Sequence, residues 1–98
     1  MLKKSYSKTG NYCRVTFKLP AEVGAETATL CGDFNEWDVT AHPMKKLKDG
    51  SFSVTLSVPA GQTYSFRYLL DGDRWENDWE PDGYQPNEHG EDNSLVTV

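Results

Sequence analysis

The sequence predicts an all-β protein, an immunoglobulin-like antiparallel β-sandwich, from three observations. Its 98 residues are enough for one domain with one modest core. Short segments that alternate apolar and polar residues recur at near-regular spacing, with clusters of Gly, Pro and Asp between them. No segment has a convincing helical period. Strands with one apolar side bury that side when two sheets pack face to face, so a sandwich is the natural solution.

The first two expected strands span residues 12–19 and 27–31. Pro20 ends the first strand. Its apolar face consists of Cys13, Val15, Phe17 and Leu19. After the second strand, Gly32 frees the backbone to turn into residues 34–37. We expect the apolar face of the first strand to point into the core.

Four more features complete the expected sandwich. A third strand at 44–47 forms a hairpin with a fourth at 52–58, through a type I′ turn at Asp49-Gly50. The fifth strand, residues 63–70, sends its aromatic residues inward and leaves Arg67 exposed on the outer face. A turn at 71–73 leads into a Trp-, Pro- and acid-rich segment, residues 74–92, and a closing strand follows at 94–98.

The net charge of −5 is distributed unevenly along the chain. Bases without an acid among them occupy the start, namely Lys3, Lys4, Lys8, Arg14 and Lys18. Residues 71–92 are acidic, with Arg74 as their single base. We therefore divide the chain into a basic N-terminal segment, residues 1–11, and one β-sandwich domain, residues 12–98. Nucleic acid is excluded as a partner, because the aromatic-rich part of the chain is also its most acidic part.

The N-terminal residues are basic but no apolar run follows them, and no later segment has the length of a membrane span. We expect a cytoplasmic protein without a membrane partner. Two cysteines do not make a disulfide framework, so we expect two reduced thiols, with Cys13 pointing inward and Cys31 outward.

Tryptophans in polar surroundings are the strongest functional signal. Trp37 lies in a turn between Glu36 and Asp38, and Trp75 lies in the polar segment 73–78. An exposed indole flanked by acids suits a ligand with both apolar and hydroxyl faces, and sugars are such ligands. The alternative is that Trp37 plugs the end of the sandwich.

Metal binding and catalysis have weaker support. The acidic run at Asp71, Asp73, Glu76 and Asp78 lacks the spacing and central Gly of a calcium loop, and the two histidines stand apart from each other and from both cysteines. The acids lie in hydrated sequence with nothing apolar to raise a pKa, as glycoside hydrolysis requires. We expect no metal, no cofactor and no enzymatic activity.

Three motifs in order carry a resemblance to a known family. They are residues 30–37 (LCGDFNEW), residues 66–72 (FRYLLDG) followed closely by Trp75, and residues 92–96 (DNSLV). Over residues 12–98 the chain resembles the family-48 carbohydrate-binding modules. These are also called isoamylase N-terminal or early-set domains, and they occur in branching and debranching enzymes and in the beta subunit of AMP-activated protein kinase.

The resemblance implies a non-catalytic module that binds alpha-1,4-linked glucan, such as glycogen, starch or maltodextrin. It assigns the sugar site to Trp37, Arg67, Trp75 and Asn93. The chain departs from the glycogen-binding members in three places: Arg67 stands where the kinase subunits have Lys, one extra residue precedes Trp75, and residues 79–91 are unusually acidic.

A second function and two further aromatic residues stay open. The alternative function is a protein-interaction or scaffolding module for a glucan-metabolising enzyme, as a monomer or as a weak homodimer formed through an unpaired sheet edge. Trp79 and Tyr84 are interpreted as residues that pin the long segment onto the sheet, with sugar binding as the other reading.

Overall fold

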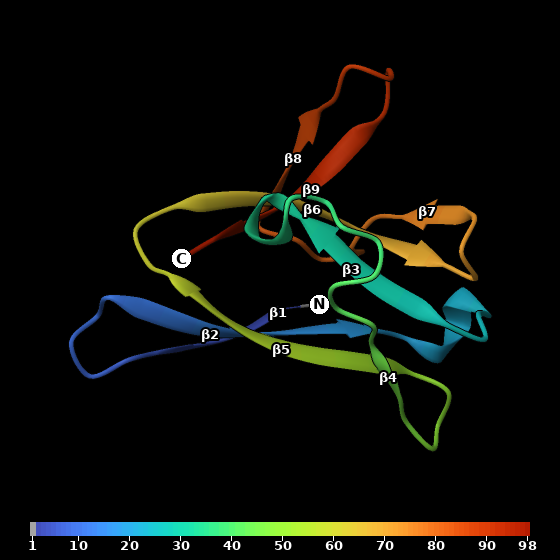
Figure 1. Ribbon diagram of the computed structural model, residues 1–98, viewed down its shortest axis with the longest axis horizontal. Coiled ribbons are helices and arrows are strands. Elements are labelled where there is room, and N and C mark those ends of the chain that lie inside the picture. Colours follow the sequence, from blue (N-terminus) through green and yellow to red (C-terminus); the bar gives the residue numbers. More distant parts are fainter. Residues whose placement is uncertain (1) are drawn as a thin grey trace.

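The structure, a computed structural model, describes residues 2–98, and these form two antiparallel sheets packed face to face (Figure 1). The first sheet has the strand order β1 (Leu2–Tyr6), β2 (Tyr12–Leu19), β5 (Phe52–Pro59), β4 (Lys45–Lys46). The second has the order β3 (Ala28–Gly32), β6 (Thr63–Leu70), β9 (Asp92–Thr97), β8 (Gly83–Pro86), and β7 (Arg74–Glu76) pairs with β6. Two 3-10 turns, η1 (Ala21–Val23) and η2 (Asp33–Asn35), flank β3. The predicted fold class is confirmed.

The core lies between the sheets and follows the alternation of the strands. The inward residues of β2, from Cys13 to Leu19, are at most 1% exposed. On the facing strand β6, Phe66 and Tyr68 are fully buried. Phe17 and Phe66 pack edge to face across the two sheets, with ring centroids 5.1 Å apart. Such aromatic pairs stabilise the core beyond the area they bury.

Strand β1 is the main element that the sequence did not predict. It pairs with β2 from Leu2↔Phe17 to Tyr6↔Cys13. Leu2 packs against the core, and Lys4 Nζ lies 2.6 Å from Asp82 Oδ2. Residues of the basic N-terminal segment therefore extend the first sheet. Met1 lies outside the described residues.

The two Asp-Gly turns differ in geometry. At Asp49-Gly50 only Gly50 has a positive φ, of 88°, and its N–H donates to the Leu47 carbonyl at 3.0 Å. The expected type I′ turn is therefore wrong at this hairpin, since that turn needs positive φ at both central residues. Asp71 and Gly72, between β6 and β7, do have positive φ values, of 54° and 78°.

Both cysteines are free and fully buried. Cys31 pairs in register with Arg67, so it lies on the outer face of the second sheet, as expected, but the chain after η2 covers it. Its Sγ lies 3.8 Å from the Asp38 carbonyl oxygen. Burial, and then the Asp38 charge, raise the pKa of the Cys31 thiol.

Two polar residues among those described, Asp78 and Ser94, are fully buried beside the core. Asp78, in the long segment, accepts a hydrogen bond of 2.7 Å from the Tyr68 hydroxyl, and its backbone N–H donates to Ser94 Oγ at 2.9 Å. Burial, followed by the Asp78 charge, raises the pKa of Tyr68 well above its usual value of 10.0. These bonds join the long segment to β6 and β9 in the interior of the protein. They also satisfy the buried groups, since a buried polar group is stable only when it is hydrogen-bonded.

Within residues 2–98, no helix has both the length and the apolar character that a bilayer crossing needs.

Candidate functional site

The η2 turn positions Trp37 over the outer face of the second sheet. The backbones of Glu36 and Trp37 both have positive φ, of 56° and 58°, and the Trp37 N–H donates to the Gly32 carbonyl at 2.9 Å. Positive φ in two successive residues other than glycine is strained backbone, which is typical of functional sites. The side chain of Asn35 holds the turn, because it accepts from the Gly32 N–H and donates to the Leu30 carbonyl, both at 3.0 Å.

Asp33 fixes the orientation of the Trp37 ring. The indole Nε1 donates to Asp33 Oδ1 at 3.1 Å, and the second oxygen, Oδ2, accepts from the Ser65 N–H at 2.8 Å. One carboxylate therefore ties the indole edge to strand β6. Trp37 is half-buried, so one part of the ring is available to a ligand.

The β6–β7 hairpin positions Trp75. Because Asp71 and Gly72 turn the chain tightly, Trp75 lies opposite Leu69 in register, next to the outer face of β6. Its side chain is 41% exposed. The centroids of the Trp75 and Trp37 rings are 6.5 Å apart and their planes meet at 63°. The two indoles therefore lie edge to face.

Arg67 lies between these aromatic residues on β6. Its guanidinium carbon is 5.7 Å from the centroid of the Trp75 ring, and Nη1 is 3.2 Å from Glu91 Oε1. The side chain is only 11% exposed, so the expectation of an exposed Arg67 is wrong: the neighbouring indole and the acid of the next hairpin cover its stem. Its Nε is buried and has no hydrogen-bond partner among the described residues. A buried donor without a partner is costly, because it has given up its hydrogen bond to water.

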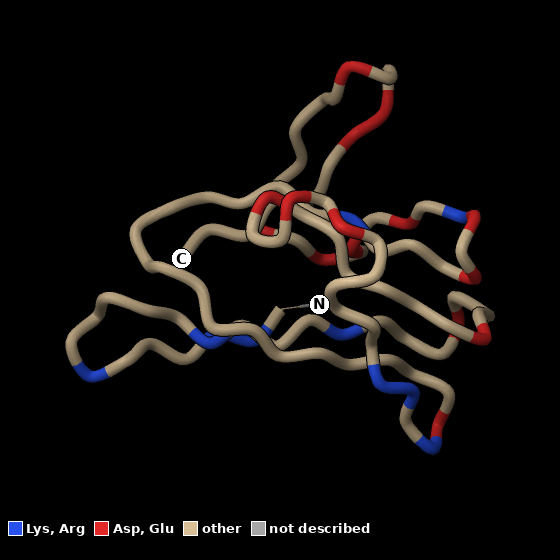
Figure 2. The backbone as a smooth tube through the Cα atoms, in the orientation of Figure 1, with Lys and Arg blue, Asp and Glu red and all other residues tan. Residues whose placement is uncertain are grey.

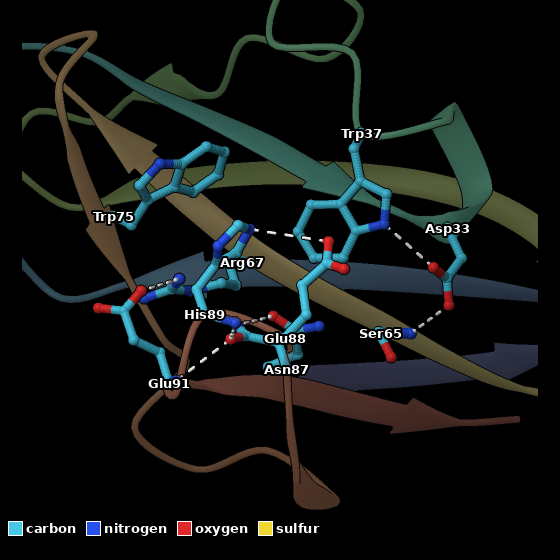
Figure 3. A pocket seen from close by; sticks show the side chains of 10 residues that line it. Asp33, Trp37, Ser65, Arg67, Trp75, Asn87, Glu88, His89 and Glu91 are labelled. Carbon is cyan, nitrogen blue, oxygen red and sulfur yellow. Dashed lines mark hydrogen bonds and ion pairs between the residues drawn. The ribbon is translucent and has the colours of Figure 1, made fainter.

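A cavity of about 550 Å³ brings the four predicted site residues together. Its lining comprises Trp37, Arg67, Trp75 and Asn93, with Asp33, Ser65, Asn87, Glu88, His89 and Glu91. In Figure 3 the two indoles stand on either side of it. The arrangement offers apolar ring faces next to hydrogen-bond donors and acceptors. These groups complement the apolar C–H faces and the hydroxyl groups of a sugar ring.

The β8–β9 hairpin forms the third wall of this cavity. Asn93, on β9, is partly buried, and its Oδ1 accepts a hydrogen bond of 3.2 Å from Asn87 Nδ2. The Asn87 Oδ1 accepts the backbone N–H groups of His89 and Glu91, at 2.9 and 3.1 Å. The loop at the hairpin tip is therefore ordered from within and carries two acids and a histidine to the cavity.

Six lining residues were not predicted as site residues. Ser65 could have been found from the strand period, because it lies two residues before Arg67 on the same face. Asp33 lies inside the motif that contains Trp37, but only the fold reveals its bonds to the indole and to β6. The hairpin-tip residues come close to the indoles only through the pairing of β8 with β9, which no local pattern specifies.

Trp79 and Tyr84 do not line this cavity. Trp79 is 49% exposed, and its Nε1 donates to Glu76 Oε2 at 2.9 Å. The Tyr84 hydroxyl donates to the Asp78 carbonyl at 2.8 Å. These bonds lie within the long segment, and a role of either residue in holding that segment stays a prediction.

Three acids of the run from Asp71 to Asp78 each have partners of their own. Asp71 accepts two backbone N–H groups, Glu76 accepts the Trp79 indole, and Asp78 is buried against Tyr68. Across residues 2–98 the structure gathers no group of three His, Cys, Asp or Glu side chains that could hold a metal ion.

Fold and site together define a class of protein: a small immunoglobulin-like β-sandwich with an open, aromatic-lined groove on the outer face of one sheet. Residues 5–85 match the family model of carbohydrate-binding module 48, the isoamylase N-terminal domain. The chain belongs to this family. The matched residues include Trp37, Arg67 and Trp75, whereas the hairpin tip and Asn93 follow them. No curated protein matches the chain significantly.

Proposed function

We propose that the protein binds alpha-1,4-glucan without catalysing a reaction on it, in the groove between Trp37 and Trp75. Membership of a carbohydrate-binding family supports a sugar ligand in general. The observation that carries the proposal is the shared groove: two indoles with ring centroids 6.5 Å apart, and a guanidinium 5.7 Å from one of them.

The proposed recognition combines stacking with hydrogen bonding. The faces of the two indoles pack against the C–H faces of successive glucose residues, and the angle between the rings suits a chain that curves. The exposed part of the Arg67 guanidinium donates to ligand hydroxyls, and the Asn93 amide both donates and accepts. Each stacked ring contributes on the order of 1–3 kcal/mol, by analogy with bases stacked on aromatic residues.

Binding is expected to be weak, because an open groove makes few contacts and a flexible polymer must be ordered. Dissociation constants from about millimolar to tens of micromolar correspond to roughly −4 to −6 kcal/mol. Such affinity suits a module that keeps a protein near a polymer with many equivalent sites.

Two of the three carboxylates that line the groove support a role in binding rather than in hydrolysis. Both oxygens of Asp33 accept N–H groups, and Glu91 is paired with Arg67. Glycoside hydrolysis needs two carboxyl groups that flank the scissile bond, one of them as a proton donor. The proposal therefore assigns these acids to positioning Trp37 and Arg67.

Titration calorimetry with maltoheptaose tests the proposal. Trp37→Ala and Trp75→Ala should each weaken binding about tenfold or more, which corresponds to the stacking energy of one ring. Trp79→Ala is the matched control, because it removes a half-exposed indole outside the groove, and it should bind like the wild type. Equal losses in all three variants, or no heat from the wild type at millimolar sugar, would contradict the proposal.

We also propose that the protein is cytoplasmic. Two free, buried thiols are compatible with the reducing cytoplasm. A glucan-metabolising enzyme as partner, and a monomeric or weakly dimeric state, stay predictions. Co-purification from cells after alpha-amylase treatment would separate an enzyme partner from proteins held only through a shared polymer.

A further inference from the structure

The outer face of the first sheet carries a cluster of basic and hydroxyl side chains that the glucan groove does not use. The strand register aligns two rows across β1, β2 and β5: Lys3, Thr16 and Thr55 in one row, and Ser5, Arg14 and Ser57 in the next. The β2 residues between these rows are buried in the core, so the rows themselves face away from it.

A shallow hollow of about 170 Å³ opens on this face. Its lining comes from three strands: Lys3, Lys4, Ser5, Arg14, Thr16 and Thr55. Every side chain in this lining carries an ammonium, a guanidinium or a hydroxyl group, and none carries a carboxylate. Lys4 lies opposite the buried Val15, so its ammonium points to the other face of the sheet, and the remaining groups are able to donate hydrogen bonds to an anion.

The cations of the hollow differ in their partners. Lys4 is engaged with Asp82 at 2.6 Å, whereas the ion pairs found within residues 2–98 include neither Lys3 nor Arg14. Because Lys3 lies opposite Thr16, Arg14 is its diagonal neighbour on β2, at a typical Cα separation of about 7–8 Å. Like charges on neighbouring positions of a sheet repel each other, and an anion between them would offset the repulsion.

The hydroxyl groups add a donor between the strands. Thr16 Oγ1 and Thr55 Oγ1 are 2.9 Å apart, so one hydroxyl donates to the other. The second hydroxyl proton of this pair is then available to an outside acceptor.

The distribution of charge over the molecule favours an anion at this face. Although the protein carries a net charge of −5, Figure 2 shows basic residues along β1, β2 and the β4–β5 hairpin, while most acids lie in the loops of the other sheet. Asp49, in the turn of that hairpin, is an acid near Lys18 and lies outside the hollow. An anion is therefore attracted to the first sheet and repelled by the groove side.

We propose that this hollow binds a phosphate monoester, at a site separate from the glucan groove and independent of it. A phosphate monoester presents three strong acceptor oxygens in a tetrahedral arrangement. The Lys3 ammonium, the forked Arg14 guanidinium and the free hydroxyl of the threonine pair can each donate to one of them. A planar carboxylate has two oxygens and would use only part of this donor set.

Amide NMR spectra test the site, with inorganic phosphate and methyl phosphate as probes and sodium chloride keeping the ionic strength constant. Both probes should give saturable shifts at Ser5, Arg14, Thr16 and Thr55, with no change at the indoles of the groove. The double variant Lys3→Gln/Arg14→Gln should raise the dissociation constant about tenfold or more, as expected for losing two charge-assisted donors.

The matched control is Lys8→Gln/Lys48→Gln, which removes the same charge from two turns outside the hollow. It should titrate like the wild type. The proposal is overturned if neither phosphate gives saturable shifts, if both double variants lose binding equally, or if inorganic phosphate binds and methyl phosphate does not. The shift map of the wild-type protein decides the matter even if the first double variant does not fold.

Discussion

Arg67 concentrates the chemistry of the groove in one side chain. It combines a guanidinium over the Trp75 ring, an ion pair of 3.2 Å with Glu91, and a buried Nε that no described residue satisfies. A lysine in this place would keep the charge but would lose the planar fork and its contact with the indole. Arginine at this position therefore provides a guanidinium, which can bind two hydroxyls at once.

This geometry predicts a graded loss of glucan binding at residue 67. Arg67→Lys should weaken maltoheptaose binding by about 1 kcal/mol, and Arg67→Gln by about 2 kcal/mol, because hydrogen bonds to charged groups contribute about 1.5–3 kcal/mol each. Titration calorimetry at constant salt measures both. If Arg67→Gln binds as well as the wild type, Arg67 serves only to order the hairpin tip.

At the residue scale, a local motif was enough to predict where some of these side chains lie, and their role in sugar binding stays a prediction. Trp37, Arg67 and Trp75 follow recognisable turns or strand positions, and all three line one cavity. Degree of burial was harder to predict, because the cover comes from distant residues: Glu91 covers Arg67, and the chain after η2 covers Cys31. Strand alternation specifies the face of a residue, and only the fold specifies what lies above that face.

Among the elements, the η2 turn depends on close packing at Gly32. Its φ of −174° is extended backbone that any residue adopts, so the requirement for glycine is steric. A Cβ there would lie 2.6 Å from the Ser65 carbonyl oxygen, 2.8 Å from Phe34 Cζ and 2.9 Å from Phe66 Cβ. The missing side chain lets the strand that leads to Trp37 lie directly on β6.

Gly32→Ala should lower the free energy of unfolding by about 1–3 kcal/mol, the usual cost of overpacking. It should also weaken glucan binding, because the turn that carries Trp37 must shift. Urea unfolding measures the first effect. Gly83→Ala is the control, since its Cβ would meet only Leu95 Cδ1 at an ordinary 3.6 Å. Equal stability of the Gly32→Ala and Gly83→Ala variants would refute the steric argument.

The β6–β7 turn links stability to pH through Asp71. Its carboxylate accepts the backbone N–H groups of Thr27 and Glu26, and these bonds hold its pKa below the usual value of 3.8. A carboxyl group whose pKa is lower in the folded state stabilises the fold above its unfolded pKa. That contribution is lost as the pH falls through the folded pKa, which lies below 3.8.

Asp71→Asn should therefore reduce stability at neutral pH and flatten the fall in stability in acid. The difference in thermal midpoint between Asp71→Asn and the wild type is expected to shrink as the pH falls below about 4, because Asp71 then becomes neutral in both states. A difference that stays constant down to strongly acidic pH would show that the carboxylate charge does not contribute.

At the scale of the whole molecule, the two outer faces have opposite chemistry. The second sheet presents indoles and acids, and the first presents cations and hydroxyls, around a common apolar core. The overall sandwich was predictable because most strands alternate apolar and polar residues and are separated by turn residues. Strands β1 and β8 were not, since the first lies in a basic, poorly alternating segment and the second in a polar one. Both are strands because of their partners, β2 and β9.

If a glucan lies against Trp37 and Trp75, the indole N–H signals of the three tryptophans will report it in one experiment. Titration with maltoheptaose should shift the signals of Trp37 and Trp75 saturably and with the same dissociation constant, while the signal of Trp79 stays in place because that ring lies outside the groove. Unchanged signals of Trp37 and Trp75 at millimolar sugar, or a shift confined to Trp79, would show that glucan does not bind in the groove.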